Sequence, residues 1–286
     1  MARYGLPYKG SKNSIAAAII EQLPRAHTLI DAFAGGCAIT HAAIESGKYE
    51  HIIANDIEPT VAAFIRCTEG DIPKRTPTRD QFKQSTDLLE RLVWSFGNNM
   101  VDYLWAEDIE PLKVAAERCL LSDTVQERYT GWRLLIRELA EYINKTGLEN
   151  PSRPINLQGL QGLQRLQRLE RLQGLEGLQC LQGLQCLQGD YRDIPIPPPD
   201  TSTIIYCDPP YRGTRGYSTD FNIDTFDNWA RTQHHPTFIS EYTQIKGFTV
   251  IWQAQKHVTI GDNGKHATEL LMVQDHYAHH YTNTLF

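Results

Sequence analysis

The chain has 286 residues, 41% of them hydrophobic and 22% charged, a composition typical of a globular protein with room for one large α/β domain and a smaller insert. It contains no run of about 18 apolar residues and its first residues lack the apolar core of a signal peptide, so we predict a cytoplasmic protein without a membrane span. The net charge of −6 does not exclude nucleic-acid binding, because phosphate contacts depend on local clusters of Lys and Arg.

The first 68 residues alternate between strand and helix patterns. Two short apolar runs predict buried strands at 28–31 and 52–56. Apolar residues at helical spacing predict helices, which are expected at 13–23, 37–45 and 59–67. Strands that alternate with helices indicate an α/β fold with a doubly wound, Rossmann-like sheet.

After residue 68 the pattern becomes mainly helical. The helices are expected at 79–93, 110–121 and 125–144. Strand patterns then return, around Tyr206 and at 238–242, 248–252 and 269–273. The simplest organisation is a single sheet domain formed by 1–68 and 190–286, with a helical domain inserted at 69–156.

Between these segments, residues 157–189 repeat a leucine at every third position, with Gln or Glu and then Gly, Arg or Cys between them. A period of three does not match an α-helix, on which each leucine would step back by about 60°. It also lacks the alternation of a half-buried strand. We expect a separate, partly ordered repeat segment without a catalytic role, whose Arg165, Arg168 and Arg171 are solvated.

The tetrapeptide Asp208-Pro209-Pro210-Tyr211 directly follows the apolar run 203–207. The two prolines end the strand in a stiff, extended turn at its carboxyl end, where open α/β sheets bind ligands. This turn suits a planar base that carries an NH2 group: Asp208 and the carbonyl of Pro209 would accept its two hydrogens, and Tyr211 would stack on its face. Arg212, Arg215 and Tyr217 follow in a stretch that we expect to be a mobile loop.

A second candidate site follows the strand at 28–31. In Asp31-Ala-Phe-Ala-Gly35-Gly36, adjacent glycines permit a sharp turn and close approach to a ligand. The preceding acid suits the cationic amino-acid end of S-adenosylmethionine better than a phosphate. Asp56 ends the next predicted strand, where a carboxylate can accept the two ribose hydroxyls.

The six cysteines form no Cys-x-x-Cys pair and have no matching histidine spacing, so we predict free thiols and no metal site. His234, His235, His276, His279 and His280 lack a companion carboxylate at ligand spacing, and we expect them on the surface.

Four segments, Pro7–Lys12, Asp31–Gly36, Ile53–Asp56 and Asp208–Tyr211, together resemble the Dam-type, alpha-group N6-adenine-specific DNA methyltransferases. Three more, 95–99, 103–105 and 238–242, resemble segments of phage and prophage members of that family. That family has its motifs in this order, with a target-recognition domain between the glycine loop and the catalytic tetrapeptide. The resemblance covers most of the chain except the leucine repeat, and it implies a Rossmann-like methyltransferase sheet with a target-recognition domain at 69–156.

The resemblance also implies a role for each matching residue. Tyr8 and Lys12 would contact S-adenosylmethionine, and Asp190 with Tyr191 would lie beside its adenine. The catalytic residues so implied are Asp208, Pro209, Pro210 and Tyr211. The cofactor-binding residues so implied are Tyr8, Lys12, Asp31, Phe33, Gly35, Gly36, Asp56, Asp190, Tyr191 and Asp208.

We therefore expect a site-specific DNA methyltransferase that transfers a methyl group from S-adenosylmethionine to N6 of a flipped-out adenine. The expected partner is double-stranded DNA, bound by a monomer that acts alone or with a cognate restriction endonuclease. Cytosine-C5 methylation is disfavoured, because it uses a cysteine nucleophile typically in a Pro-Cys pair, which the chain lacks. Two alternatives remain: an RNA base N-methyltransferase, and a DNA-binding protein whose catalytic activity has decayed.

Overall fold

The computed structural model describes residues 4–8, 10–73, 76–146, 183–211, 221–258 and 265–281. Contacts divide the chain into two compact units, which are described separately. The first comprises Met1–Leu6, Gly10–Ile65 and Leu178–Phe286, and the second comprises Pro7–Lys9 and Arg66–Gly177.

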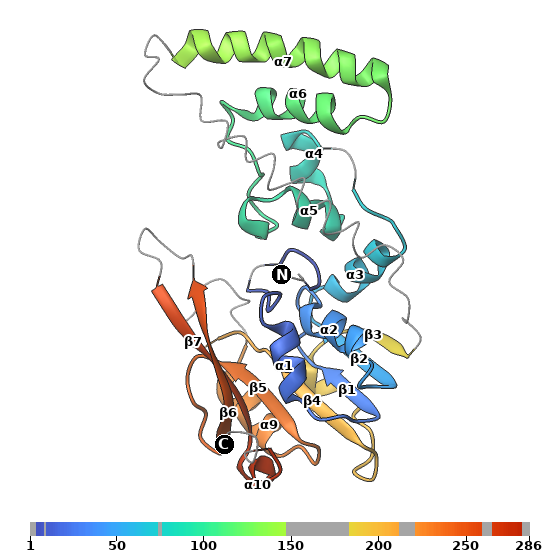
Figure 1. Ribbon diagram of the computed structural model, residues 1–286, viewed down its shortest axis with the longest axis vertical. Helices are drawn as coiled ribbons and strands as arrows, with labels where there is room; N and C mark the ends of the chain where they lie inside the picture. Colours follow the sequence, from blue (N-terminus) through green and yellow to red (C-terminus); the bar gives the residue numbers. More distant parts are fainter. Residues whose placement is uncertain are drawn as a thin grey trace. The chain divides into compact units, whose positions relative to one another are not determined.

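Within the described part of the first unit, seven strands form one sheet in the order β3-β2-β1-β4-β5-β7-β6 (Figure 1). Neighbouring strands from β3 to β5 are parallel, whereas β7 is antiparallel to both β5 and β6. The strands are β1 Thr28–Asp31, β2 His51–Asp56, β3 Leu184–Gln188, β4 Thr203–Cys207, β5 Thr237–Glu241, β6 Phe248–Val258 and β7 Lys265–Gln274. The predicted doubly wound sheet is confirmed, and its order reverses between β1 and β4.

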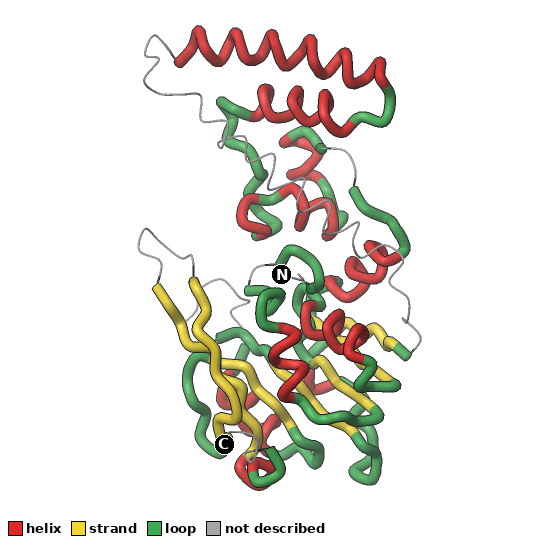
Figure 2. Tube along the Cα trace, in the orientation of Figure 1, coloured by secondary structure: helices red, strands yellow, loops and turns green. Residues whose placement is uncertain are grey.

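Helices cover both faces of this sheet (Figure 2). Successive residues of a strand point to opposite faces, so Leu29 joins one core with α1 and α2, and Ile30 joins the other with α9. Strands buried on both faces read as continuous apolar runs, which is why β1 and β4 were recognisable from sequence. The helical elements of this unit are α1 Ala16–Gln22, α2 Ala38–Ser46, α3 Thr60–Thr68 (which ends in the second unit), η3 Tyr191–Asp193, α9 Ile223–Arg231 and α10 Asp275–Ala278.

The end of the leucine repeat departs from the sequence prediction, because Leu184–Gln188 forms strand β3 and pairs with β2. A period of three places successive leucines on opposite faces of a strand. Leu184 accordingly packs on the core of α1 and α2, whereas Leu187 packs on the core of α9. The second segment of the sheet domain therefore begins before residue 190, where the sequence predicted it to begin. The rest of the repeat, with Arg165, Arg168 and Arg171, lies outside the described residues, as do Arg212, Arg215 and Tyr217.

The second unit is helical in its described residues, as the insert was expected to be. Helices α6 and α7 form an antiparallel pair. Gly131 of α7 lies so close to α6 that a Cβ at this position would be 2.4 Å from the backbone nitrogen of Cys119. The elements are α4 Arg79–Gln84, α5 Leu88–Trp94, η1 Phe96–Asn98, α6 Glu110–Leu121 and α7 Val125–Thr146.

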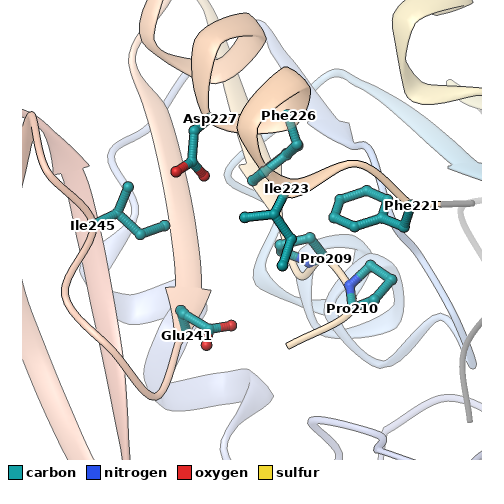
Figure 3. Close-up of a pocket in the computed structure, with 8 residues that line it drawn as sticks. All are labelled: Pro209, Pro210, Phe221, Ile223, Phe226, Asp227, Glu241 and Ile245. Atoms are coloured by element: carbon teal, nitrogen blue, oxygen red, sulfur yellow. The ribbon is translucent and has the colours of Figure 1, made fainter. Parts of the chain in front are cut away.

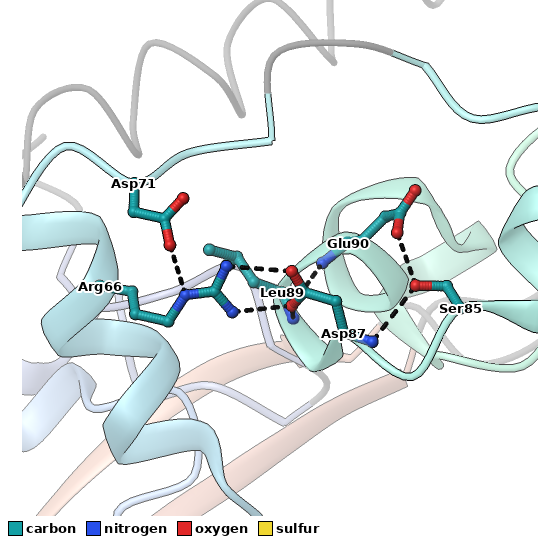
Figure 4. A network of polar contacts seen from close by, with 6 residues as sticks. All are labelled: Arg66, Asp71, Ser85, Asp87, Leu89 and Glu90. Carbon is teal, nitrogen blue, oxygen red and sulfur yellow. Dashed lines mark hydrogen bonds and ion pairs between the residues drawn. The ribbon is translucent and has the colours of Figure 1, made fainter.

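The single helix predicted at 79–93 is two helices, α4 and α5, because Asp87 starts a new one. Its carboxylate accepts a hydrogen bond from the backbone of Leu89 at 2.9 Å, as an N-cap does. The same carboxylate accepts hydrogen bonds from both terminal nitrogens of Arg66, at 2.8 and 3.0 Å. Arg66 also donates a hydrogen bond to Asp71 (Figure 4). The Arg66 guanidinium lowers the pKa of Asp87, which stays charged and keeps both roles.

In the described ranges, no helix is both long and apolar enough to cross a bilayer. The five cysteines there form no disulfide with one another.

Candidate active site

The two sequence motifs meet at the switch point of the sheet. Strands β1 and β4 are paired with Asp31 opposite Tyr206, and the backbone nitrogen of Ala32 donates to the Tyr206 carbonyl at 3.0 Å. The glycine loop and the tetrapeptide therefore leave adjacent strands at the same edge. In doubly wound sheets this crevice is where ligands bind.

The glycine loop after β1 is held by the end of β2. Gly35 has a positive φ of 49°, and its backbone nitrogen donates to Asp56 Oδ2 at 2.7 Å. The nitrogen of Ala34 donates to the Asn55 carbonyl at 2.8 Å. The other Asp56 oxygen accepts the nitrogen of Glu58 at 3.0 Å. Asp56 thus fixes the loop through one oxygen, and each oxygen keeps lone-pair capacity for a further donor.

Asp31, the last residue of β1, is 1% exposed. Its Oδ2 accepts the Thr40 hydroxyl at 2.6 Å, whereas its Oδ1 is buried and accepts no hydrogen bond from the residues that the structure describes. Burial raises the pKa of Asp31, the Thr40 hydrogen bond lowers it, and the charges of Asp208 and Asp56 raise it; together they bring the pKa to about 7. A cation at Oδ1 would stabilise the ionised carboxylate.

Aromatic rings line the β1 and β3 side of the crevice. The Phe33 ring lies 5.2 Å from that of Tyr191, and both contact Phe226 on α9. Asp190, beside Tyr191, binds Arg192 through both carboxylate oxygens at 2.8 and 2.7 Å, and this pairing lowers its pKa. The predicted residues Phe33 and Tyr191 are thus brought together, and Asp190 has a protein partner that the sequence did not predict.

Lys12 lies in the interior of this site. It is 3% exposed, and its Nζ donates to Asp208 Oδ1 at 2.7 Å and lies 3.5 Å from Glu269 Oε1. Burial by itself lowers the pKa of Lys12, but the carboxylates of Asp208 and Glu269 outweigh it and the pKa is raised. Lys12 is therefore a charged partner of the tetrapeptide, a contact that the amino-terminal motif alone did not predict.

Tyr211 is anchored at both its hydroxyl and its ring. The hydroxyl donates to Glu269, and the ring meets that of Tyr242 edge-on at 4.4 Å. The Lys12 ammonium lies 4.6 Å from the ring centroid, over one face. Lys12 therefore covers one face of the Tyr211 ring. The sequence analysis did not predict Glu269 as a site residue. An acid at the start of the predicted strand 269–273, directly before four apolar residues, was a signal of a buried polar contact.

Pro209 and Pro210 of the tetrapeptide line a small open pocket (Figure 3). Its other walls are mainly apolar side chains from α9, from the residues before α9 and from Ile245, together with the acids Asp227 of α9 and Glu241 at the end of β5 (Figure 3). The lining residues are Pro209, Pro210, Phe221, Ile223, Phe226, Asp227, Glu241 and Ile245. Pro209 is buried and Pro210 half-buried, so the turn that the two prolines predict lies against the protein.

Residues 8–104 match the family model of the D12 class N6 adenine-specific DNA methyltransferases. The matched segment contains Tyr8, Lys12, the glycine loop and Asp56, and it continues into the second unit. It confirms the resemblance predicted from the motifs; a phage-like origin stays a prediction. No curated protein matches the chain.

Within this matched segment, all the predicted site residues but one belong to the first unit. Tyr8 is the exception, since it belongs with Pro7–Lys9 to the second unit.

Among the described residues, no cluster of His, Cys, Asp and Glu could hold a metal ion. The expectation of surface histidines was wrong for His235, which is 3% exposed and has Nε2 2.8 Å from the Pro197 carbonyl oxygen.

One further residue of the site, Gly5, was not predicted. It has φ of +65°, and a Cβ there would lie 2.2 Å from the Gly36 carbonyl oxygen. The neighbouring Leu6 nitrogen donates to that same oxygen at 2.6 Å. The amino-terminal segment thus packs directly on the glycine loop, and only glycine fits at this contact.

We predict that Gly5→Ala sharply weakens binding of S-adenosylhomocysteine, because the new methyl group must displace the glycine loop. Gly47→Ala is the matched control, since Gly47 also has a positive φ (+60°) but no atom within 4 Å of its ideal Cβ. The control should lose only about 1–2 kcal/mol of stability to backbone strain. Calorimetric titration of both folded variants is the measurement, and equal affinities would contradict the proposed contact.

Proposed function

We propose that this protein methylates N6 of a flipped-out adenine in double-stranded DNA and that S-adenosylmethionine is the methyl donor. The observation that carries the proposal is the meeting of Asp208 and Pro209 with the glycine loop at the switch point between β1 and β4. The match of residues 8–104 to adenine-specific DNA methyltransferases supports it independently.

The described residues fit this cofactor. The buried Oδ1 of Asp31 suits the ammonium of the methionine end, because it is a carboxylate oxygen that accepts no hydrogen bond from the described residues. Asp56 would accept the ribose hydroxyls and the Phe33 and Tyr191 rings would pack against the adenine. When bound, S-adenosylmethionine supplies a methyl group made electrophilic by its sulfonium.

The tetrapeptide would prepare the nitrogen for methylation. Lys12 binds Asp208 Oδ1, which fixes the carboxylate and stabilises its negative charge. The other oxygen of Asp208 and the Pro209 carbonyl would accept the two N6 hydrogens, so that the nitrogen lone pair points along one direction. Holding this direction favours direct in-line transfer without a covalent enzyme intermediate.

The chain must also stabilise an adenine that has left the DNA helix. Extrusion costs a few kcal/mol of stacking and pairing. The face of the Tyr211 ring opposite Lys12 would return about 1–3 kcal/mol by stacking. The edge contact with Tyr242 and the bond to Glu269 hold that ring in place before the base arrives.

The helical unit would serve as the target-recognition domain. Its helix α7 has Tyr129 and Trp132 on the surface at 57% and 52% exposure, beside the exposed Arg128, Arg133 and Arg137. Exposed arginines and aromatic rings are the side chains that contact phosphates and bases. The predicted monomer, the cytoplasmic location and a cognate restriction endonuclease remain part of this proposal.

We predict that S-adenosylhomocysteine binds about tenfold more weakly at pH 6 than at pH 8. The raised pKa of Asp31, about 7, means that the carboxyl group loses its charge as pH falls through that value. A neutral carboxyl group cannot pair with the amino-acid ammonium of the ligand, so affinity should rise with pH. Asp31→Asn should bind weakly at every pH in this range, and a wild-type pH dependence in that variant would remove Asp31 from the site.

Transfer of labelled methyl groups from S-adenosylmethionine to separate DNA and RNA substrates tests the proposed function. Label in double-stranded DNA is the expected result. Label in RNA alone would favour an RNA base methyltransferase, and DNA binding without label would favour a decayed enzyme.

A further inference from the structure

Glu269 is an acidic residue buried in strand β7, between strands β5 and β6. It has 0% exposure, although the four residues that follow it on β7, 270–273, are all apolar. It accepts the hydroxyl of Tyr211, and its Oε1 is 3.5 Å from Lys12 Nζ. Both contacts are with residues that touch the tetrapeptide or belong to it.

These contacts form one connected network. Lys12 is shared between two carboxylates, with Asp208 at 2.7 Å and Glu269 at 3.5 Å. Tyr211 is held from three directions, by Glu269 at its hydroxyl, by Lys12 over one face and by Tyr242 at its edge. Among the described residues, Asp208, Tyr211, Tyr242 and Glu269 are thus ionisable groups that act on Lys12.

Such a network is a poor way to gain stability alone. Removing charges from water costs several kcal/mol per ion, and a buried ion pair is often no better than apolar residues of the same shape. Its advantage is geometric, because each member restricts the position of the next. The residues restricted here are the two side chains proposed to contact the adenine.

We propose that Glu269 is a positioning residue of this active site: it holds Lys12 and the Tyr211 hydroxyl, so that the Asp208 carboxylate is fixed for the amine and the Tyr211 ring is fixed for the base. This inference rests on the proposed function. Glu269 itself contacts no substrate. It acts through Lys12 and Tyr211.

Glu269→Gln tests the role with little change in shape. Glutamine still accepts the Tyr211 hydroxyl but no longer attracts the Lys12 ammonium. We expect kcat to fall at least tenfold while the KM for DNA and the affinity for S-adenosylhomocysteine stay within about threefold of wild type. The alkaline limb of the kcat profile should move to lower pH, because the carboxylate of Glu269 is one of the two that raise the pKa of Lys12 against its burial.

Gln274→Met is the matched control. Gln274 is a fully buried polar residue of the same strand, and it bonds Thr237 and Ala230 instead of the site. Its replacement should lower stability without moving the pH profile. If Glu269→Gln merely destabilised the sheet, the two variants would behave alike, and that result would overturn the positioning role.

A second readout separates this inference from the proposed function. NMR titration of labelled lysine should show a lower pKa for Lys12 in Glu269→Gln than in wild type, whether or not the protein methylates DNA. An unchanged Lys12 pKa together with wild-type kcat would overturn the role of Glu269. A lower Lys12 pKa in Glu269→Gln than in wild type would support the network. If the wild-type protein then transferred no methyl group, only the proposed function would be contradicted.

Discussion

Asp208→Ala is expected to lower kcat for DNA methylation by at least about a hundredfold, the scale of losing one preorganised polar contact to the reacting group. The variant has no carboxylate to accept an N6 hydrogen, so the lone pair of the amine stays delocalised into the ring. The variant also loses the 2.7 Å ion pair between Lys12 and Asp208, which is shorter than the 3.5 Å pair between Lys12 and Glu269.

Cofactor binding should survive the same change. Asp31, Asp56 and the glycine loop are held by contacts that do not include Asp208, such as Thr40 with Asp31 and Gly35 with Asp56. Calorimetric titration with S-adenosylhomocysteine measures this directly. Asp224→Ala, at an exposed acid of α9, is the control for loss of a carboxylate and should keep wild-type turnover. Full activity of Asp208→Ala would remove the residue from the chemistry.

Lys12→Met is expected to lower the free energy of unfolding by about 3–5 kcal/mol, because it leaves two carboxylates in the interior without their cation. Lys12 and Glu269 are almost fully buried and Asp208 is 18% exposed, so solvent screens them little. The pKa of Lys12 is raised above its ordinary 10.5, so its stabilising contribution is complete below pH 10.5 and is lost as pH rises through the raised value.

The double variant Lys12→Met/Glu269→Gln separates stability from activity. It removes one cation and one anion together, and we expect chemical denaturation to show that much of the lost stability returns. Activity should not return, because Asp208 still lacks its partner. Lys48→Met is the control for a lysine, since Lys48 binds carbonyl oxygens of α1 and its end, including Ile20 and Leu23, away from the tetrapeptide. Recovery of activity in the double variant would show that Lys12 is needed only for folding.

The sheet and the location of its functional edge followed from the sequence because local patterns encode them. Strands β1, β2 and β4 are largely apolar runs ending in Asp31, Asp56 and Cys207, and glycines or prolines that favour turns follow each of them within a few residues. Since the carboxyl ends of neighbouring parallel strands share an edge, the glycine loop and tetrapeptide could be expected to meet.

The network behind the tetrapeptide did not follow from the sequence. Lys12, Asp208 and Glu269 are far apart in the chain, and their contact depends on the pairing of β7 with β5 and on the path of the amino-terminal segment. No local pattern specifies such pairings. Gly5 was missed for the same reason, since its requirement for glycine arises from the Gly36 carbonyl oxygen.

Strand β3 was missed because the repeat was not compared with a strand that packs on both faces. A strand covered on both faces needs no alternation, and Leu184 and Leu187 satisfy it with a spacing of three. Gly183 at its start has φ of +92° and approaches the Glu50 carbonyl oxygen, a position that the glycine of the triplet permits. The break between α4 and α5 was missed because the capping role of Asp87 was overlooked.

The most direct test of the account is mass spectrometry of the nucleosides released from duplex DNA after incubation with the protein and S-adenosylmethionine. The acceptor pair formed by Asp208 and Pro209, with the family match of residues 8–104, predicts N6-methyl-2′-deoxyadenosine, and predicts its loss with Asp208→Ala. A product methylated at cytosine alone, or the same yield of methylated adenine from the Asp208→Ala variant, would contradict it.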